Sequence, residues 1–246
     1  MRLADASALV TGSSRGIGAA VARALAARGA RVVLHGRDGD RLRALAAELD
    51  AVAHTVDLLD PSGPATLAAH AGPVDILVHS AGVGWRGSLR QMSGKDVDRL
   101  LTVNLRAPLE LTRALLPAMV EAGRGHVAFV TSIAGLSGVA HEAVYSAAKG
   151  GLAIFADALA AELAGTGVTV SSIAPGAVDT DFWTTRGAAY GRRCPRLISA
   201  QRVGELLVRD IERGDGARVV PRWLAIAPAV RAVAPGLYRR RAPRLG

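Results

Sequence analysis

The chain has 246 residues, of which 50% are hydrophobic and only 4% aromatic, with 30 Lys and Arg residues against 21 Asp and Glu residues. This length and composition are typical of one globular α/β domain with a large aliphatic core, and they argue against intrinsic disorder. A single cysteine, Cys194, excludes an internal disulfide and a cysteine-based zinc site, and it favours a reducing, cytoplasmic setting. The strand-like run that begins at Ala6 leaves no room before it for a signal peptide.

The net charge of +9 comes almost wholly from arginine, since Lys95 and Lys149 are the only lysines. With Ala and Gly also abundant, this bias is typical of a GC-rich genome, and we prefer that interpretation to nucleic-acid binding. The histidines show no metal-ligand spacing, so we expect no metal site. One local excess lies at the C-terminal end, where no acid accompanies Arg222, Arg231, Arg239, Arg240, Arg241 and Arg244.

Short apolar runs alternate with helical patterns along the chain, which predicts a Rossmann-type, doubly wound parallel sheet of about seven strands with helices on both faces. We expect a catalytic domain at 1–222, with a substrate lid near 176–199, and a basic and apolar tail at 223–246. The strands are expected at 8–11, 31–35, 51–56, 74–79, 126–131, 169–173 and 218–221. The helices are expected at 16–28, 38–49, 62–71, 96–121, 144–164 and 200–213.

The first strand leads into a glycine-rich turn, with Gly12, Gly16 and Gly18 in a G-x-x-x-G-x-G spacing. Glycines at such a turn let the backbone approach a pyrophosphate, and the helix that follows offers free N–H groups and a positive dipole. A glycine turn alone is equally well explained as a structural turn. Its position between a strand and a helix favours a dinucleotide-binding loop.

The end of the second strand indicates which nicotinamide cofactor is taken. An NAD site places an acid there to accept from the ribose 2′-OH, whereas this strand ends in Gly36 followed by Arg37. Arg15 of the glycine loop is expected on the same side, and two guanidiniums suit a 2′-phosphate. Either arginine alone could be a solvated side chain, and Asp38 could serve as a displaced ribose acceptor. Together these residues predict NADP(H).

Tyr145 and Lys149 lie four apart on an expected helix and therefore share one face. Tyrosine, with an ordinary pKa of about 10, is a poor acid at neutral pH, and a nearby ammonium lowers that pKa. The pair predicts a proton donor and its tuning group, although a Y-x-x-x-K match alone is common by chance. Ser132 follows the fifth strand, where its hydroxyl could polarise a carbonyl. Asn104 lies within an amphipathic helix, and its spacing alone favours an exposed position.

With these motifs in order, the chain resembles the short-chain dehydrogenase/reductase family, in its branch of single-domain enzymes of about 250 residues. The resemblance covers about residues 6–178 and implies roles for four catalytic residues. Tyr145 would donate its proton to the substrate oxygen as hydride leaves the nicotinamide, and Ser132 would hold that oxygen. Lys149 would bind the nicotinamide ribose and lower the pKa of the tyrosine. Asn104 would anchor a water that leads protons in from solvent.

The resemblance also assigns residues around the cofactor. Where the family usually has Asn-Asn-Ala-Gly after the fourth strand, this chain has a sequence that begins with His79, which we interpret as a structural substitute. The candidate cofactor-binding residues are Gly12, Ser14, Arg15, Gly16, Ile17, Gly18, Arg37, Asp57, Leu58, Ala81, Gly82, Asn104, Tyr145, Lys149, Pro175, Gly176, Val178 and Thr180.

The substrate is expected to be an apolar or lipid-like carbonyl compound or secondary alcohol, because Phe182 and Trp183, in a loop flanking the four catalytic residues (the tetrad), favour an apolar partner. Phe182 and Trp183 could equally pack the lid onto the domain. We therefore predict an NADP(H)-dependent oxidoreductase. A 3-oxoacyl carrier-protein reductase and a non-catalytic NADPH-binding scaffold are the alternatives. The candidate pocket residues are Trp85, Ser132, Val139, His141, Phe182 and Trp183.

The C-terminal tail lacks the Gly-rich ending of the family's tetrameric reductases and is similar to the ending of members that handle steroids or other lipids. One interpretation places Trp223 and Leu224 in an anionic membrane surface with the arginines at headgroup level. The alternative, which we favour slightly, folds the tail over the pocket or onto a partner subunit. The small residues of the helix at 144–164 predict close packing against a second copy, and hence a homodimer or homotetramer.

Overall fold

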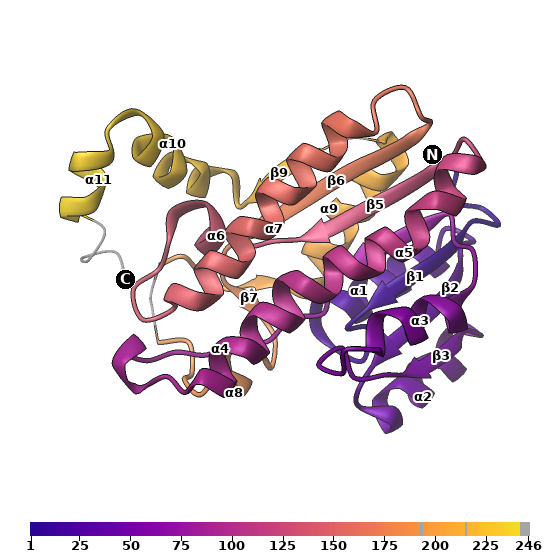
Figure 1. The fold of residues 1–246 in the computed structure, drawn as a ribbon, viewed down its shortest axis with the longest axis horizontal. Helices are drawn as coiled ribbons and strands as arrows, with labels where there is room; N and C mark the ends of the chain where they lie inside the picture. Colours follow the sequence, from indigo (N-terminus) through magenta and orange to yellow (C-terminus); the bar gives the residue numbers. More distant parts are fainter. Residues whose placement is uncertain (192–193, 215, 242–246) are drawn as a thin grey trace.

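A computed structural model describes residues 1–191, 194–214 and 216–241. Its centre is a parallel sheet of seven strands in the order β3-β2-β1-β4-β5-β6-β9, which confirms the expected Rossmann-type architecture (Figure 1). The direction of strand addition reverses between β1 and β4, and ligands of such sheets bind where this reversal opens a crevice at the carboxyl edge. The strands are β1 (Ser7–Thr11), β2 (Arg31–Gly36), β3 (Val52–Thr55), β4 (Ile76–His79), β5 (Gly125–Val130), β6 (Val168–Pro175) and β9 (Ala217–Val220).

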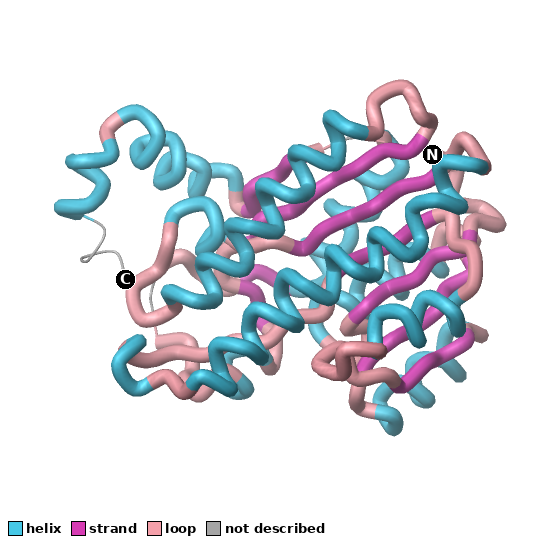
Figure 2. The backbone as a smooth tube through the Cα atoms, in the orientation of Figure 1, coloured by secondary structure: helices cyan, strands magenta, loops and turns pink. Residues whose placement is uncertain are grey.

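Helices cover both faces of the sheet. Successive residues of each strand point to opposite sides, so apolar side chains on both faces need a covering layer. Ala8 and Val10 of β1 pack into the cluster on one face, and Leu9 between them packs into the cluster on the other. The first face carries α1 (Gly16–Ala26), α2 (Gly39–Leu49) and α9 (Ala200–Arg213). The second carries α3 (Gly63–Ala71), α5 (Ala107–Glu121) and α7 (Ala143–Glu162) (Figure 2).

The structure divides the single helix expected at 96–121. It contains α4 (Gly94–Leu101), a π-helical turn at Thr102–Arg106, and α5. A π turn holds one residue more than an α turn, so it rotates the side chains that follow it relative to an uninterrupted helix. Pro108 stands at the start of α5, where the chain passes from the π-helical turn into the α-helix.

Several short elements that were not expected gather beyond the carboxyl ends of the strands (Figure 1). These are the 3₁₀ turn η1 (Leu89–Gln91), α6 (Ile133–Ser137), α8 (Phe182–Thr185) and a small two-stranded sheet of β7 (Val178–Asp179) and β8 (Ile198–Ser199). The lid expected near 176–199 thus contains β7, α8 and β8 in the part of it that the structure describes.

The tail is helical and lies beside α6. It forms the 3₁₀ turn η3 (Arg222–Ala225), α10 (Ile226–Val233) and α11 (Pro235–Arg241). Arg231 donates to the Leu136 carbonyl at 2.8 Å, and the Tyr238 hydroxyl donates to the Ser137 carbonyl at 2.6 Å. Arg244, at the end of the basic run, lies outside the described residues. None of the described helices combines the length and apolarity that crossing a bilayer requires.

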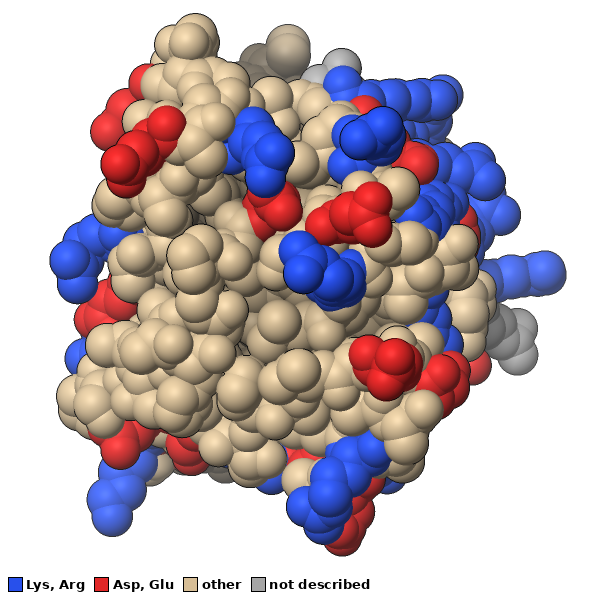
Figure 3. Space-filling model, turned by 90° about the vertical axis from the view of Figure 1, so that its right-hand side faces the viewer, with Lys and Arg blue, Asp and Glu red and all other residues tan. Residues whose placement is uncertain are grey.

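On the face shown in Figure 3, the blue basic side chains are interspersed with red acidic ones around a broad uncharged area. Ion pairs such as Arg23–Glu48 at 2.7 Å bring opposite charges together on the surface. Acidic side chains therefore accompany part of the basic surplus on this face.

Candidate active site

One cavity of about 1040 Å³ runs along the carboxyl edge of the sheet from the glycine loop to the tail. Of the candidate cofactor-binding residues, Asn104 alone does not line it. The cavity has a polar end, built on β1, β2 and the glycine loop, and a more apolar end between α6, α8 and the tail.

The glycine loop has no space for side chains. Gly12 has a φ of +68°, and a Cβ built on it would lie 2.6 Å from the Cα of Ala81. A Cβ on Gly18 would lie 2.3 Å from the carbonyl oxygen of Gly12. The helix that follows begins after Arg15 with no side-chain cap and no acid in its first turn, so its terminal N–H groups and positive dipole face the cavity unneutralised. This backbone cradle fits the pyrophosphate of a dinucleotide.

At the end of β2, Gly36 lies against the phosphate loop, since a Cβ there would meet the Ser14 Oγ at 3.1 Å. Arg15 and Arg37 line the same cavity, as expected. They are not the only charged side chains in this region, because an acid and a third arginine lie beside Arg15. Arg15 lies 3.5 Å from Asp181, which Arg41 also contacts at 2.9 Å. Arg37 makes no ion pair with any described residue.

Asp38, the alternative ribose acceptor, is already engaged. Its carboxylate caps α2 by accepting from the backbone N–H of Arg41 at 3.1 Å, and it lies 3.3 Å from the Arg41 guanidinium. Arg41 and Asp181 were both missed from the sequence. Asp181 could not be expected at this site because 140 residues separate it from Arg41.

Ser132, Tyr145 and Lys149 are all buried and line the same stretch of the cavity. Ser132 directly follows β5 and caps α6, with its Oγ accepting from the Ala134 N–H at 3.2 Å. Burial raises the pKa of Tyr145 to about 12, and a hydrogen bond with Ser132 opposes that rise. Burial lowers the pKa of Lys149 to about 8. Its Nζ donates to the Val130 carbonyl at 2.8 Å, so the lysine is held against β5.

Asn104 is fully buried in the π-helical turn, which corrects the exposed position that its spacing favoured. Its Nδ2 donates to the carbonyls of Val83 at 2.9 Å and Leu100 at 3.0 Å, while its Oδ1 accepts from the Val83 N–H at 3.2 Å. These bonds fix the loop after β4. In that loop, a Cβ on Gly82 would lie 3.0 Å from the Asn104 Oδ1 and 3.7 Å from the Lys149 Nζ. Asn104 therefore stands directly behind the cavity wall.

His79 replaces the family's asparagine at the end of β4 and faces the interior. Its Nε2 lies 2.8 Å from the Thr112 Oγ1, and its ring stacks on Phe129 at 4.9 Å between centroids. Burial lowers the pKa of His79 to about 3, with a smaller contribution from Lys149. The side chain is absent from the cavity lining and packs within the domain.

The substrate end differs in part from the predicted pocket. Val139, Phe182 and Trp183 line the cavity with Ser132, whereas Trp85 and His141 do not. Trp85 lies beside Gly87 and packs against the cluster that contains Leu100 and Tyr145. His141 is an exposed turn residue with a φ of +65°. Sequence proximity to the tetrad did not reveal these orientations. The tail also lines this end, in agreement with the slightly favoured interpretation that folds it over the pocket, and it contributes Trp223, Leu224, Ala227 and Tyr238.

A buried ion pair closes the same end. Glu142, three residues before Tyr145, pairs with Arg186, which follows the lid helix α8. The Arg186 guanidinium also lies 4.3 Å from the centre of the Trp183 ring. The pair links the residue after α8 to the residue before α7. Among the residues that the structure describes, no group of three potential metal-ligating side chains occurs.

Comparison with known proteins agrees with this arrangement. The family model "short chain dehydrogenase" matches residues 6–191. An uncharacterised oxidoreductase of Myxococcus xanthus is 36% identical over 248 residues, which cover 97% of this chain and 96% of the relative. A short-chain dehydrogenase from Sphingobium yanoikuyae in complex with NADPH superposes with a TM-score of 0.84 at 27% identity, over 94% of this chain and 95% of that one. A 3-ketoacyl-(acyl-carrier-protein) reductase from Brucella melitensis complexed with NADH gives a TM-score of 0.82 at 27% identity, over 89% and 99%.

Proposed function

Because the chain belongs to the short-chain dehydrogenase/reductase family, and is thus an oxidoreductase of C=O and CH–OH groups, we propose that it reduces an apolar ketone or aldehyde with NADPH. The observation that carries the proposal is the convergence of Ser132, Tyr145 and Lys149 on a cavity that also contains the glycine loop. The same residues serve alcohol oxidation, so the direction follows the ratio of reduced to oxidised cofactor that the cell maintains.

The cradle of Gly12 and Gly18 and the uncapped start of α1 would hold the pyrophosphate, and Asp57 and Leu58 would lie at the adenine. Lys149, held against Val130 and facing Gly82, would bind the nicotinamide ribose. When bound, the nicotinamide supplies or accepts a hydride, which is chemistry that no side chain provides.

The phenol of Tyr145 donates its proton to the substrate oxygen. Burial raises the pKa of this phenol to about 12, so the phenol is protonated at neutral pH but is a weak acid, and it depends on Lys149 to release its proton. The ammonium of Lys149 favours the phenolate that remains after transfer. Because burial lowers the pKa of Lys149 to about 8, the lysine can itself release and regain a proton near neutral pH.

The Ser132 hydroxyl donates a hydrogen bond to the same substrate oxygen and polarises the carbonyl. Its position is fixed because it also caps α6 at the end of β5. Asn104 positions the loop after β4 through its three bonds to Val83 and Leu100, and a water beside it would carry protons inward.

The preference for NADP(H) is proposed from the end of β2. This strand ends without an acid, and Arg15 and Arg37 line the cavity there, where they suit a 2′-phosphate. The NADPH complex of the Sphingobium protein agrees with this preference, and the NADH complex of the Brucella reductase is the reason to test it directly.

An apolar substrate is proposed from the walls of the other end. Val139, Phe182, Trp183 and Leu224 present mainly carbon surface next to the tetrad, and such surface favours ligands that bring little charge. The Glu142–Arg186 pair satisfies its own charges and leaves the remaining wall apolar.

A 3-oxoacyl carrier-protein reductase is the second candidate, favoured by the similarity to the Brucella reductase. The two functions differ in how the substrate enters, because a carrier protein must dock its acidic surface at the cavity mouth. The helical tail with Trp223 and Tyr238 occupies one side of that mouth, so we place this candidate second.

Two measurements test the proposal. Calorimetric titration should show tighter binding of NADPH than of NADH, and tighter NADH binding would reject the cofactor assignment. Oxidation of NADPH should then be followed with a series of ketones of increasing alkyl length and with an acyl-carrier-protein thioester. Faster turnover of the thioester than of every free ketone would favour the second candidate.

The tail lines the cavity, and its outward side also offers apolar surface for membrane contact, the interpretation that the sequence favours slightly less. It exposes Trp223 (50%), Ile226 (64%), Val233 (88%) and Leu237 (54%) in a region that carries arginines and no acid. We propose peripheral contact with anionic lipid at this surface. Co-sedimentation with phosphatidylserine vesicles should be lost when Ile226, Val233 and Leu237 are replaced by Ser. Equal sedimentation of both proteins would reject the contact.

A homodimer or homotetramer is proposed from α7. This helix exposes Ile154 (69%) together with Ala143, Ala147 and Ala158, and small side chains allow a second copy of the helix to approach closely. Analytical ultracentrifugation of the wild type and of Ile154→Lys measures the assembly. A monomeric wild type would reject it.

A further inference from the structure

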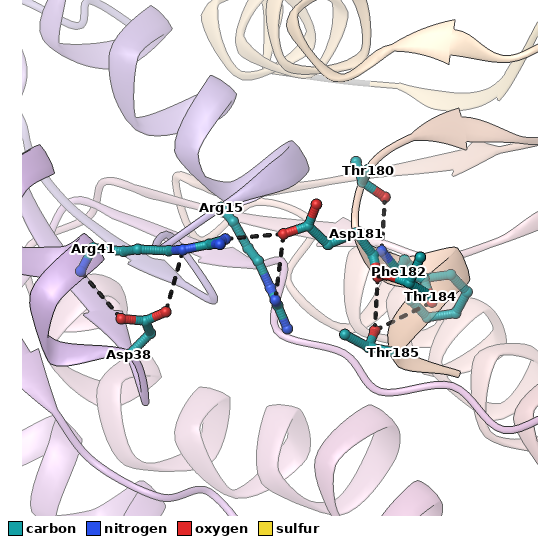
Figure 4. Close-up of polar contacts among 8 residues, drawn as sticks. All are labelled: Arg15, Asp38, Arg41, Thr180, Asp181, Phe182, Thr184 and Thr185. Carbon is teal, nitrogen blue, oxygen red and sulfur yellow. Dashed lines mark hydrogen bonds and ion pairs between the residues drawn. The ribbon is translucent and has the colours of Figure 1, made fainter. Parts of the chain in front are cut away.

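Asp181 lies between two arginines from distant parts of the chain (Figure 4). Its Oδ2 is 2.9 Å from Arg41, in the first turn of α2, and 3.5 Å from Arg15, at the start of α1. Arg41 also contacts Asp38 at 3.3 Å. Asp181 itself stands directly before the lid helix α8. One carboxylate thus links the lid to the two helices that begin beside the cofactor cavity.

This carboxylate stands at the wall of the cofactor cavity. Arg15 and Asp181 line both that cavity and a neighbouring one of about 760 Å³, whereas Arg41 lines only the second. The first cavity includes Gly36 and Arg37 at the end of β2, where the adenosine ribose of a dinucleotide lies. A phosphate on the 2′ position of that ribose would therefore arrive beside the side chains that Asp181 now engages.

The ion pairs of Asp181 are weak enough for a phosphate to replace its carboxylate. All three side chains are about half exposed, with 45% for Arg15, 51% for Arg41 and 50% for Asp181. Exposed pairs of this kind change an equilibrium by only about two- to five-fold each. A phosphate monoester brings a charge of about −1.5 to −2 and three acceptor oxygens, so it binds a pair of guanidiniums more strongly than one carboxylate does.

We infer that Asp181 is an internal competitor for the 2′-phosphate of NADP(H), and that Arg41 binds this phosphate together with Arg15. The inference rests on the proposed preference for NADP(H) and adds Arg41, which the sequence did not single out. The hydrogen bond from Arg41 lowers the pKa of Asp181, so its carboxylate is charged and competes at neutral pH.

Replacement of Asp181 by the 2′-phosphate at the two arginines also affects the substrate end, because Asp181 forms hydrogen bonds with the first turn of α8. Its carbonyl accepts from the Thr184 hydroxyl at 2.9 Å and from the Thr185 N–H at 3.0 Å (Figure 4). The next residue, Phe182, has its ring centre 5.5 Å from that of Tyr145. When the 2′-phosphate takes both guanidiniums, the turn that carries Phe182 loses its link to α1 and α2. NADH, which lacks this phosphate, leaves the link in place.

Two nucleotide fragments isolate the phosphate. Adenosine 2′,5′-bisphosphate and adenosine 5′-monophosphate differ only in the 2′-phosphate, so the ratio of their dissociation constants reports on that site alone. Asp181→Asn should strengthen bisphosphate binding by about two- to ten-fold, as expected for removal of two exposed ion pairs, and leave the monophosphate unchanged. Arg41→Ala should weaken bisphosphate binding and also spare the monophosphate.

Asp40→Asn is the matched control for the change of charge. Asp40 stands in the same first turn of α2 as Arg41, is 93% exposed, and pairs with Arg43 rather than with Arg41. This variant should leave the ratio of the two dissociation constants at the wild-type value.

Hydrogen exchange at backbone amides measures the opening of α8 and does not depend on the affinity for the nucleotide fragments. The amides of Thr185 and Arg186 are bonded to the carbonyls of Asp181 and Phe182. The bisphosphate should accelerate their exchange in the wild type, whereas in Asp181→Asn exchange should be fast without it. Unchanged exchange in both proteins would reject the link to the lid.

The outcomes separate this inference from the proposed cofactor. A wild-type preference for the bisphosphate that Asp181→Asn leaves unchanged would overturn the competition and leave the NADP(H) assignment standing. Equal binding of both fragments by the wild type, with a preference that appears in Asp181→Asn, would support the competition and contradict the assignment. Equal binding by both proteins would overturn both.

Discussion

The two ends of the cavity reach their shapes by different means. At the cofactor end the walls are backbone, and a Cβ on Gly12 or Gly18 would lie within 2.6 Å of another main-chain atom. At the substrate end the walls are side chains from α6, α8 and the tail, such as Phe182 and Leu224. A wall of backbone is fixed by the sheet and helix that carry it, whereas a wall of side chains changes with single substitutions. Shared cofactor chemistry and variable substrates follow from this difference.

The largest expected effect lies where the two ends meet. Tyr145→Phe removes the proton donor and no other group, so turnover should fall by about 10²–10⁴-fold. Binding of NADPH, measured by calorimetry, should stay near the wild-type value because the glycine loop is untouched. Tyr190→Phe is the comparison, since that phenol contacts the Pro195 carbonyl and should cost much less. Turnover at a normal rate in Tyr145→Phe would show that another group supplies the proton.

The backbone wall should tolerate no added atom. A Cβ on Gly18 would lie 2.3 Å from the Gly12 carbonyl oxygen, so Gly18→Ala should destabilise the fold by about 1–3 kcal/mol and weaken NADPH binding by roughly 100-fold. Gly94→Ala is the control, because nothing lies within 4 Å of its Cβ position and α4 should gain up to about 1 kcal/mol. Urea denaturation and calorimetry measure both quantities. Normal NADPH affinity in Gly18→Ala would contradict a backbone-limited site.

Substitutions in the side-chain wall should change substrate binding and leave NADPH binding unaltered. Leu224 is 8% exposed and lines the cavity, so Leu224→Ala should raise the KM for an apolar ketone by about 10-fold, as expected for one lost aliphatic contact. NADPH affinity should not change. Val233→Ala, on a side chain that is 88% exposed, should leave the KM unaltered. A drop in NADPH affinity without a change in KM would show that the tail belongs to the cofactor end instead.

The same division explains what could be predicted from the sequence. The strands, the glycine loop and the positions of Ser132 and Tyr145 follow from local patterns, because alternation in β1 already assigns Ala8 and Leu9 to opposite faces. The burial of Asn104 could not be predicted, since the π turn shifts the helix register that its spacing presupposes.

Contacts between residues that lie far apart in the sequence could not be predicted from local patterns. The contact of Arg41 with Asp181 joins the start of α2 to the lid, and Tyr238 reaches the Ser137 carbonyl across 101 residues. Trp85 and His141 belong to loops that flank the tetrad but do not line the cavity. Sequence proximity therefore identified the loops of the substrate end and not the orientation of their side chains.

A further effect is expected only in acid, and it acts on the sheet rather than on the tail. Burial lowers the pKa of His79 and of His126 to about 3, and that of His35 to about 4. Because the unfolded chain binds these protons near pH 6.5, stability is complete above that pH and falls as the pH drops toward 4. Each histidine contributes a slope of up to about 1.4 kcal/mol per pH unit.

His79→Asn restores the residue that the family usually has at this position and tests the acid effect at the cofactor end. The free energy of unfolding, measured in urea from pH 7 to pH 4, should fall less steeply by about 1.4 kcal/mol per pH unit in this variant. An identical slope in His79→Asn would mean that the ring accepts a proton without unfolding. The stacked contact with Phe129 would then be open to water, and this end of the sheet would be less rigid than its burial indicates.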